Sequence, residues 1–535
     1  MRWSMRSLSV LAVVSVGLFS LVWPASARSR TTSPAPQKAV VHGRDSGVSR
    51  DEATSLDLLG RSAVEKGASL ADTPFADAPL ADTGRPVPLA PQQVSGFDAL
   101  ADPDSAPSDT TGARGDNFIV AAVNTQVAVY DLNGTQVLAP LQLEALNPAS
   151  VGHFTFDPKV VYDQYDDTFI LAYLVQEDSP RLSLILTVAI PNATAPSTGT
   201  WCSRSFAGDA LPGGRDTWAD YPGLGYTDTR VTITTNEFEF PSTKGSFRSS
   251  QVMTVDKAGL YDCGQSAPIP TVFAGTATRD DRGNQAFTLR PAETVGASPG
   301  AQLMVSFTPV RGKKDYLTLW RIRPTAIGFA LKRTSIATGK VSRPPPGTQE
   351  GGGLTSRDTW WDTGDTRLIN AFFDADRNEL FTAHTVFRNF KPDKLTGGYP
   401  EAANRWYEIV PATNLRDSVI GRKGIIGDAE VDVGWPTVAT NAAGVLFVTY
   451  NRASEPRDEF ISAWVSTIQP NATADSEFLL HAGAATYDAI VGPERWGDFT
   501  GINRDPVSPQ NVATFNQYAE SMVQWQQFVS LVTDD

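Results

Sequence analysis

Six stretches of the sequence repeat one layout, and this repeat constrains the fold more than any other feature. Each stretch opens on an acidic, aromatic or arginine residue beside proline or glycine, then continues as a strand-like run, a turn and a second strand-like run. The six openings begin at Phe156, Asp220, Leu289, Gly364, Gly434 and Trp496. Consecutive openings lie 62 to 75 residues apart. Self-similarity at a near-constant period indicates a solenoid, a propeller or an array.

The first unit indicates how many strands each repeat contains. Four runs rich in Val, Ile, Leu, Thr and Phe follow one another with short links, at 159–163, 169–175, 182–190 and 200–206. Four antiparallel strands per unit are typical of a β-propeller blade. A further unit, 116–143, precedes the six and has a hairpin turn at Asn133-Gly134. We therefore expect an all-β fold, a β-propeller of seven four-stranded blades, with six blades as the alternative.

The N-terminal part of the chain has a different composition. Two arginines, an apolar run at 8–22 and the small-residue motif Ala25-Ser26-Ala27 form the pattern of a secretory signal peptide. Residues 28–112 are rich in Ala, Pro, Asp, Ser and Thr, and they carry little apolar surface to offset the entropy of ordering. We predict a signal peptide at 1–27, a disordered, flexible spacer at 28–112 and the propeller domain at 113–535. The protein is expected to be secreted and extracellular.

The charge of the chain limits its partners. The formal net charge is -14 and the pI is about 4.9, which argues against a phosphate-backbone partner, so no nucleic acid is expected. No segment after the signal peptide is apolar for long enough to span a membrane. An acidic protein is compatible with calcium, but the four histidines have no metal-binding spacing, so we predict no metal site and no cofactor. We expect a monomer with an extracellular carbohydrate or protein ligand.

Two cysteines are present, Cys202 and Cys263. In an oxidising compartment they most simply form one disulfide bond. Their positions within the repeat place both near the outer strands of adjacent blades, so the bond would join two neighbours. Closing the loop of about 60 residues stabilises the fold by about 4 kcal/mol in the chain-entropy model.

The repeat units resemble exported bacterial β-propeller proteins of the BNR and sialidase-like type. The resemblance is carried by Asp157-Pro158 with Tyr162-Asp163, Asp220-Tyr221-Pro222, Arg290-Pro291-Ala292, the segment 362–368, Trp435-Pro436 and the segment 495–501. It covers about 117–532 and implies the propeller architecture without a particular activity. Sialidases are implied to need three arginines, a tyrosine with a glutamate partner, and an aspartic acid. The chain has no matching pair of tyrosine and glutamate, and Pro196 stands where the sialidase box at 194–201 has aspartate.

In a propeller the openings gather at one mouth of the central channel. We expect nine side chains to converge there: Asp157, Asp220, Tyr221, Arg290, Asp365, Arg367, Trp435, Trp496 and Asp498. Our main prediction is a binding module rather than an enzyme. The alternative is a sialidase-like glycoside hydrolase or lyase, with Asp220 and Asp498 as catalytic carboxylates and the remaining seven side chains as ligand-binding residues. A purely structural role as turn caps and wedge fillers is the third interpretation.

Overall fold

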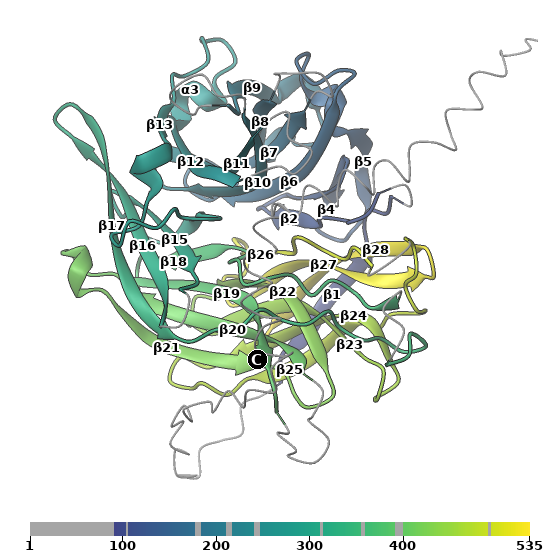
Figure 1. Ribbon diagram of the computed structural model, residues 1–535. Coiled ribbons are helices and arrows are strands. Elements are labelled where there is room, and N and C mark those ends of the chain that lie inside the picture. The colour runs from purple at the N-terminus through teal and green to yellow at the C-terminus, as the bar shows by residue number, and fades with distance from the viewer. Residues whose placement is uncertain are drawn as a thin grey trace, which may run out of the picture.

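Seven four-stranded antiparallel sheets follow one another around a common centre (Figure 1). The structure is a computed structural model that describes residues 90–534, apart from 103–104, 177–182, 210–216, 240–246, 311–313, 355–358, 391–399 and 491–493. The predicted signal peptide and most of the predicted spacer lie outside these residues. The prediction of an all-β propeller with seven blades is confirmed.

The first three blades occupy 111–273. Blade 1 contains β2 (Thr111–Arg114), β3 (Phe118–Val123), β4 (Gln126–Asp131) and β5 (Gln136–Gln142). Blade 2 contains β6 (Phe154–Asp163), β7 (Thr168–Gln176), β8 (Ser183–Pro191) and β9 (Cys202–Ala207). Blade 3 contains β10 (Thr217–Tyr226), β11 (Arg230–Glu239), β12 (Phe247–Asp256) and β13 (Thr271–Phe273), with the short helix α3 (Lys257–Tyr261) before β13. The lowest-numbered strand of each of these blades is the inner one.

The remaining blades continue the ring. Blade 4 contains β14 (Arg290–Val295), β15 (Gln302–Thr308), β16 (Asp315–Thr325) and β17 (Gly328–Gly339). Blade 5 contains β18 (Ala371–Asp374), β19 (Glu379–Arg388), β20 (Glu401–Val410) and β21 (Val419–Ile426). Blade 6 contains β22 (Asp432–Thr440), β23 (Leu446–Ser454), β24 (Glu459–Ile468) and β25 (Ser476–His481). Blade 7 contains β26 (Gly501–Arg504), β27 (Val512–Ser521), β28 (Gln524–Thr533) and β1 (Gln92–Asp98).

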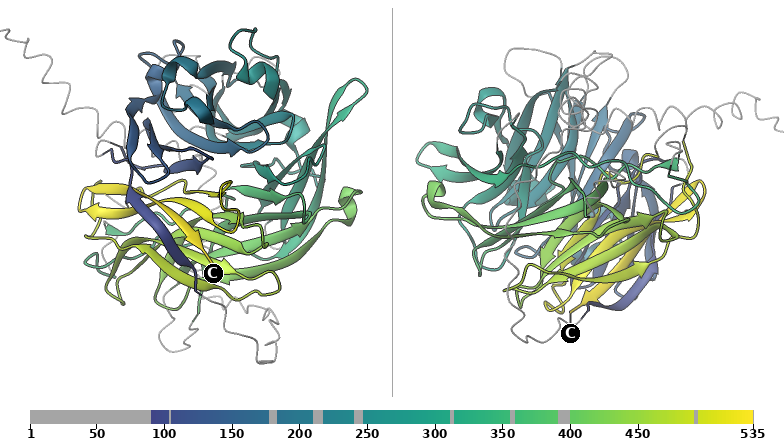
Figure 2. Two further views of the ribbon diagram at one scale, coloured as in Figure 1. Left: turned by 180° about the vertical axis from the view of Figure 1, so that it is seen from behind. Right: turned by 60° about the horizontal axis from the view of Figure 1, so that its bottom comes forward.

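The seventh blade is built from both ends of the described chain. Its strand order is β1-β28-β27-β26, and β1 pairs with β28 from Gln92 opposite Thr533 to Asp98 opposite Phe528. Figure 2 shows the purple β1 beside the yellow C-terminal strands. The pairing places β1, and β2 up to residue 112, within the segment predicted as flexible spacer. The propeller therefore begins at about residue 90 and not at 113, because its outermost last strand comes from ahead of blade 1.

The inner strands stand close together on one side of the ring. Strand β14 pairs in parallel with both of its neighbours, with β10 at Tyr226 opposite Glu293 and with β18 from Ala292 opposite Ala371. Backbone pairing at about 4.8 Å between strands leaves no open passage there. The channel is consequently narrow and lined by side chains and backbone of the inner strands.

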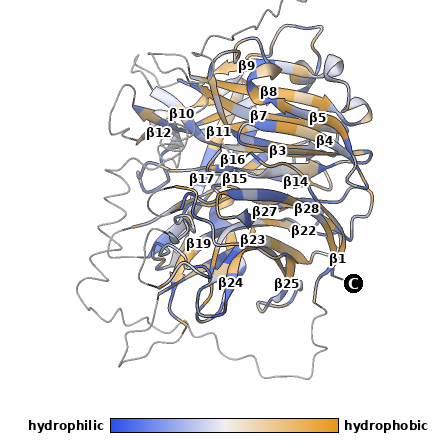
Figure 3. Ribbon diagram, turned by 90° about the vertical axis from the view of Figure 1, so that its right-hand side faces the viewer, coloured by the Kyte–Doolittle hydropathy of each residue, from blue (hydrophilic) through white to orange (hydrophobic). Residues whose placement is uncertain are grey.

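The hydrophobic core lies between blades. One cluster joins blades 2 and 3 through Ile170, Ile233 and Met253, and another joins blades 4 and 5 through Leu317 and Tyr407. Strands buried on both faces have nearly continuous apolar sequences rather than an alternating pattern. Accordingly, eight of the nine residues of β7 are buried, and Figure 3 shows orange, hydrophobic residues along β7 and β8.

The predicted disulfide bond is present. Cys202 begins β9 of blade 2, Cys263 follows α3 in blade 3, and their Cα atoms are 5.3 Å apart. This separation lies within the normal range for a disulfide. The bond joins the outer parts of two adjacent blades, as expected from the repeat. Among the described residues, no helix has the length and apolar character needed to cross a membrane.

Candidate functional site at the channel mouth

The openings recognised in the sequence are points of unusual backbone geometry. Six blades have a non-glycine residue in the left-handed region near the start of the inner strand: Asp109, Asp157, Tyr221, Thr288, Trp435 and Asp498, with φ between 49° and 93°. In β6, β10 and β22 the ladder register also shifts at this step, and proline follows the left-handed residue. A bulge redirects a side chain, and proline suits it because no ladder hydrogen bond is required. Non-glycine residues with a left-handed backbone conformation are strained, and such residues concentrate at functional sites.

Three carboxyl groups from three blades interact at this mouth. Asp109 precedes β2, Asp157 lies in β6, and Asp498 precedes β26. Burial raises the pKa of Asp109 well above its usual range, and the negative charges of Asp157 and Asp498 raise it further. The Asn124 side chain links two of these groups: its Nδ2 donates to the Asp109 carboxyl group, and its Oδ1 accepts the backbone N–H of Asp157 at 2.8 Å. The charged form of Asp109 is therefore disfavoured beside its neighbours.

Arg495 supports the third carboxyl group. Its Nη2 lies 2.8 Å from Oδ2 of Asp498, and its Nη1 lies 3.5 Å from Oδ2 of Asp362. Burial raises the pKa of Asp498, while the Arg495 charge opposes this shift. The Asp362 side chain is 35% exposed and that of Arg495 is 12% exposed, whereas Asp109 and Asp498 are buried. Asp362 and Arg495 thus form the accessible edge of the cluster.

Tyr221 connects the predicted residues of several blades. Its hydroxyl donates to the backbone oxygen of Asp498 at 3.0 Å, and its backbone N–H donates to Oδ2 of Asp157 at 3.2 Å. The guanidinium carbons of Arg290 and Arg367 lie 4.4 and 4.2 Å from its ring centroid. Burial raises the pKa of Tyr221 against the pull of both cations, so the phenol stays neutral.

Arg367 forms an ion pair with its own neighbour. Its Nε and Nη2 donate to the two carboxylate oxygens of Asp365 at 2.9 and 2.7 Å, a bidentate arrangement. Burial, the largest single cause, raises the pKa of Asp365, but the Arg367 charge, the hydrogen bonds from Arg367 and the Arg343 charge together outweigh it and the pKa is lowered. Two nitrogens of Arg367 are thus occupied. Its predicted role toward an anionic ligand stays a prediction.

Arg290 is bound mainly by backbone. Its Nε donates to the Leu368 oxygen at 2.9 Å and its Nη1 to the Pro222 oxygen at 2.6 Å. Its Nη2 is buried and has no hydrogen-bond partner in the described part of the chain. Burial lowers the pKa of Arg290 to about 10. This guanidinium ties three inner strands together and keeps one donor unused.

The remaining predicted residues also lie at this mouth of the channel, but their side chains are buried against neighbouring residues. Asp220 is fully buried in β10, opposite Asn236 of β11. Trp435 is buried, and its Nε1 donates to the Asp362 oxygen at 2.8 Å. Trp496 is buried against Tyr487, with ring centroids 5.0 Å apart. Neither indole presents an open face for a ligand, and both fill space between blades. The catalytic role of Asp220 and the binding roles of the two indoles stay predictions.

The sequence pattern did not predict Asp109 and Asn124 as residues of this site. The sequence pattern begins the first unit at residue 116, whereas the structure has the opening of blade 1 at Asp109, inside the segment predicted as spacer. A signal was available: the order Asp, Thr, Thr, Gly at 109–112 matches Asp, Phe, Thr, Gly at 498–501. Asn124 stands in the tight turn between β3 and β4, where polar residues are common, and its sequence context does not distinguish it.

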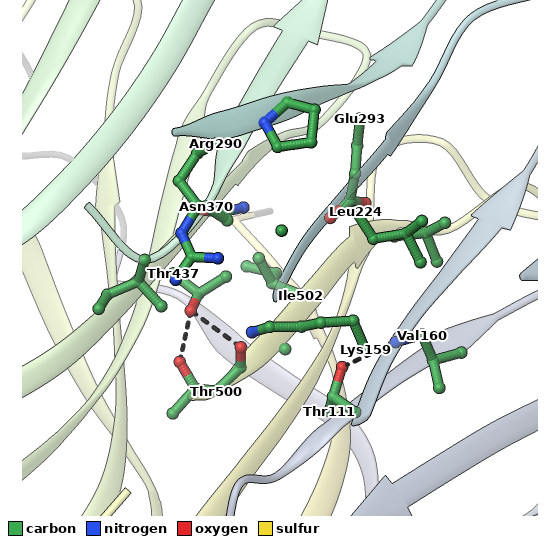
Figure 4. Close-up of a pocket in the computed structure, with 15 residues that line it drawn as sticks. Thr111, Lys159, Val160, Leu224, Arg290, Glu293, Asn370, Thr437, Thr500 and Ile502 are labelled. Carbon is green, nitrogen blue, oxygen red and sulfur yellow. Dashed lines mark hydrogen bonds between the residues drawn. The ribbon is translucent and has the colours of Figure 1, made fainter. Parts of the chain in front are cut away.

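The channel directly below the mouth contains a cavity of about 30 Å³. Figure 4 shows the residues that line it, among them Thr111, Lys159, Arg290, Glu293, Asn370, Thr437 and Thr500. This volume accommodates one or two water-sized groups and no sugar ring. A larger ligand must therefore be bound at the mouth itself.

The described residues contain no group of three or more His, Cys, Asp or Glu side chains arranged to hold a metal ion. The absence of a cofactor and the compatibility of the acidic composition with calcium both stay predictions.

No protein-family model matches the chain, and no curated protein matches it. Solved structures with a similar fold are found. A Trypanosoma rangeli sialidase in complex with sialic acid aligns with 10% identity and a TM-score of 0.36, over 76% of this chain and 57% of the sialidase chain. The chain therefore spans little more than half the length of that sialidase.

Two arabinan-degrading enzymes give similar alignments. A GH93 α-L-arabinofuranosidase of Fusarium graminearum in complex with arabinobiose has 9% identity and a TM-score of 0.36, over 82% of this chain and 97% of its own. The arabinanase Arb43A of Bacillus subtilis has 13% identity and a TM-score of 0.28, over 58% and 96%. At these identities no residue role is transferred to this chain.

Proposed function

We propose that the protein is an exported glycoside hydrolase whose reaction takes place at the channel mouth, with Asp109 and Asp498 as the principal carboxyl groups. The observation that carries the proposal is the group of three carboxyl side chains, Asp109, Asp157 and Asp498, which three blades bring to one point. Most glycoside hydrolases cleave the glycosidic bond with two carboxyl groups whose environments differ.

The environments assign a role to each group. Asp109 holds its proton because burial and two neighbouring carboxyl groups disfavour its charge, so it serves as the general acid. It gives this proton to the glycosidic oxygen as the bond to the leaving group breaks. Asp498 is paired with the Arg495 guanidinium, so it serves as the base that takes a proton from the attacking water. Asn124 and Tyr221 position these groups through the hydrogen bonds described above.

The substrate proposed is a neutral saccharide. Two arginines at the mouth are already engaged in ion pairs, Arg367 with Asp365 and Arg495 with Asp498 and Asp362. Arg290 keeps only its Nη2 unused, which is not enough for a bidentate contact with a carboxylate. A bidentate clamp for an acidic sugar would require breaking these pairs. This consideration favours a neutral sugar over a sialic acid at this site.

The burial of the carboxyl groups favours a second function. Asp109 and Asp157 are fully buried and Asp498 is 1% exposed. If no substrate reaches them, the mouth acts as an extracellular binding module whose ligand, a carbohydrate or a protein, contacts the rim at Asp362 and Arg495. The disulfide bond suits an oxidising compartment in either case.

The test compares the secreted protein with D109N, D498N and a matched control, D505N. Asp505 is equally buried, directly follows β26 and pairs with Arg114 at the opposite end of the inner strand. Each variant is incubated with a panel of neutral and acidic polysaccharides, and both released sugar and retained protein are measured. Hydrolysis that D109N and D498N lose and D505N keeps supports the hydrolase. Retention without released sugar supports the binding module, and hydrolysis unaffected in all three variants refutes the assigned roles.

A further inference from the structure

The cavity below the mouth receives two cationic side chains. Lys159 enters it from β6 and Arg290 from β14, and Figure 4 shows the lysine amine and the guanidinium pointing into the same space. Their mutual repulsion contributes to lowering the pKa of Lys159, after burial, which is the larger cause. Two cationic groups in one enclosed space repel one another, and a negative charge between them would offset this repulsion.

Lys159 has no oxygen partner in the described part of the chain. It is 9% exposed, and its Nζ lies 3.2 Å from the centroid of the Phe499 ring, a cation–π contact. A second strongly buried lysine among the described residues, Lys257, shows the partners that such a group normally has. Its Nζ lies 2.5 Å from Oδ2 of Asp163 and 2.7 Å from Oδ2 of Asp166. A buried ammonium group whose hydrogen-bonding capacity is unused is unfavourable by several kcal/mol.

The second unused donor is Nη2 of Arg290. The other two nitrogens of this guanidinium donate to backbone oxygens, and Nη2 is buried without a partner among the described residues. Among the described residues, the neutral polar groups around the cavity make hydrogen bonds with one another and with backbone, and none with Lys159 Nζ or Arg290 Nη2. Thr437 and Thr500 hydrogen-bond to one another at 2.6 Å, and both amide atoms of Asn370 are occupied by Val438.

Three carboxyl groups affect the charge of this region. Asp109, Asp157 and Glu293 all favour the charged form of Lys159. Burial raises the pKa of Glu293, which lines the cavity, to about 8, and it raises that of Asp109 well above its usual range. Burial thus disfavours the charged forms of both carboxyl groups, so they balance the positive charges of Lys159 and Arg290 only in part.

We propose that the cavity is a site for a small monovalent anion of the size of chloride, held between Lys159 Nζ and Arg290 Nη2. The volume of about 30 Å³ admits a monatomic ion and excludes sulfate with its hydration shell or an organic anion. The anion accepts the two unused hydrogen bonds and stabilises the inner strands of blades 2 and 4. The site lies below the mouth, and it does not depend on which ligand the mouth takes.

The first experiment measures anion binding to the full mature protein. Its Tm is compared in sodium chloride, sodium bromide and sodium gluconate at equal ionic strength near pH 6, and the line width of the chloride NMR signal is followed on titration with protein. We expect a Tm about 2 °C or more higher in chloride and bromide than in gluconate, and a broadened chloride signal. Equal Tm values and no broadening would mean that the cavity holds water only, which overturns the proposal.

Two variants locate the effect. K159M keeps the length of the side chain and removes its charge, so the advantage of chloride over gluconate is expected to disappear. E293Q keeps both cationic side chains and removes the titratable carboxyl group, so chloride binding is expected to weaken less between pH 7 and pH 9 than it does in the wild type. A crystal grown in bromide provides a readout that does not depend on the folding of K159M. Anomalous density between Lys159 and Arg290 supports the site, and density only elsewhere refutes it.

Discussion

Replacing one buried glutamate should remove a defined part of the pH dependence of stability. Glu237 of β11 is fully buried, and within the described ranges its carboxyl oxygens accept hydrogen bonds from the hydroxyls of Thr235 at 2.7 Å and Thr217 at 3.2 Å. No salt bridge to it occurs within the described residues. Burial raises its pKa from 4.5 to about 8, although the two hydroxyls oppose the shift.

The direction in which stability changes with pH follows from the number of protons bound by the folded and the unfolded states. Between pH 4.5 and 8 the unfolded chain has lost this proton while the folded protein keeps it. The folded state therefore binds more protons, and the free energy of unfolding falls by about 1.4 kcal/mol for each pH unit as pH rises. The contribution is complete below pH 4.5 and is lost as pH passes through 8, which amounts to about 4 kcal/mol between pH 5 and pH 8. In E237Q a neutral amide replaces the neutral acid, so this part of the slope should vanish.

Urea unfolding at pH 5, 6.5 and 8 measures the effect. Glu293 and Glu494 also have pKa values raised to about 8 by burial, so E237Q should reduce the wild-type slope and not abolish it. E408Q is the matched control, because Glu408 is ion-paired with Arg422 at 2.5 Å and its loss should lower stability over the whole pH range. A slope in E237Q equal to that of the wild type would show that Glu237 is ionised in the folded protein, which would refute the reasoning.

Three further perturbations test the architecture. C202S should lower the free energy of unfolding by about 4 kcal/mol, because the bond closes a loop of 61 residues, and reduced wild type should match the variant in a urea titration. K257M should cost about 3 to 5 kcal/mol by leaving Asp163 buried without its cation, and an unchanged Tm would contradict this. Deleting residues 90–98 removes β1 and should lower Tm while exposing β28 to protease; full resistance would argue against ring closure by β1.

The sequence predicted the ring because its signal is repeated. Bulged openings such as Tyr221-Pro222 and Trp435-Pro436 recur at the same step of blades 2, 3 and 6, and the alternation of short apolar strands with polar turns is regular. Strand β1 carries no such signal, since the sequence QQVSGFD has few apolar residues and lies within a stretch rich in alanine and proline. Its structure is determined by a partner at the other end of the chain.

The candidate site was predicted in location and less well in detail. A repeat position fixes which end of the channel a side chain approaches, so Asp157, Tyr221 and Asp498 were placed correctly at one mouth. It does not fix the partner that each side chain takes. Arg367 binds Asp365, two residues away in sequence, and Trp496 packs outward against Tyr487. Such choices depend on packing between blades, which a pattern of residue types does not contain.

The position of strand β1 also determines when the propeller ring can close during synthesis and folding. Its partner β28 is the last of the described strands, so β1 can pair with it only after β2 to β27 have been synthesised. Until then β1 has no strand to pair with, and blade 7 is not yet present between blades 6 and 1. A chain that ends prematurely keeps this unpaired edge exposed, and proteolysis should remove it before it accumulates.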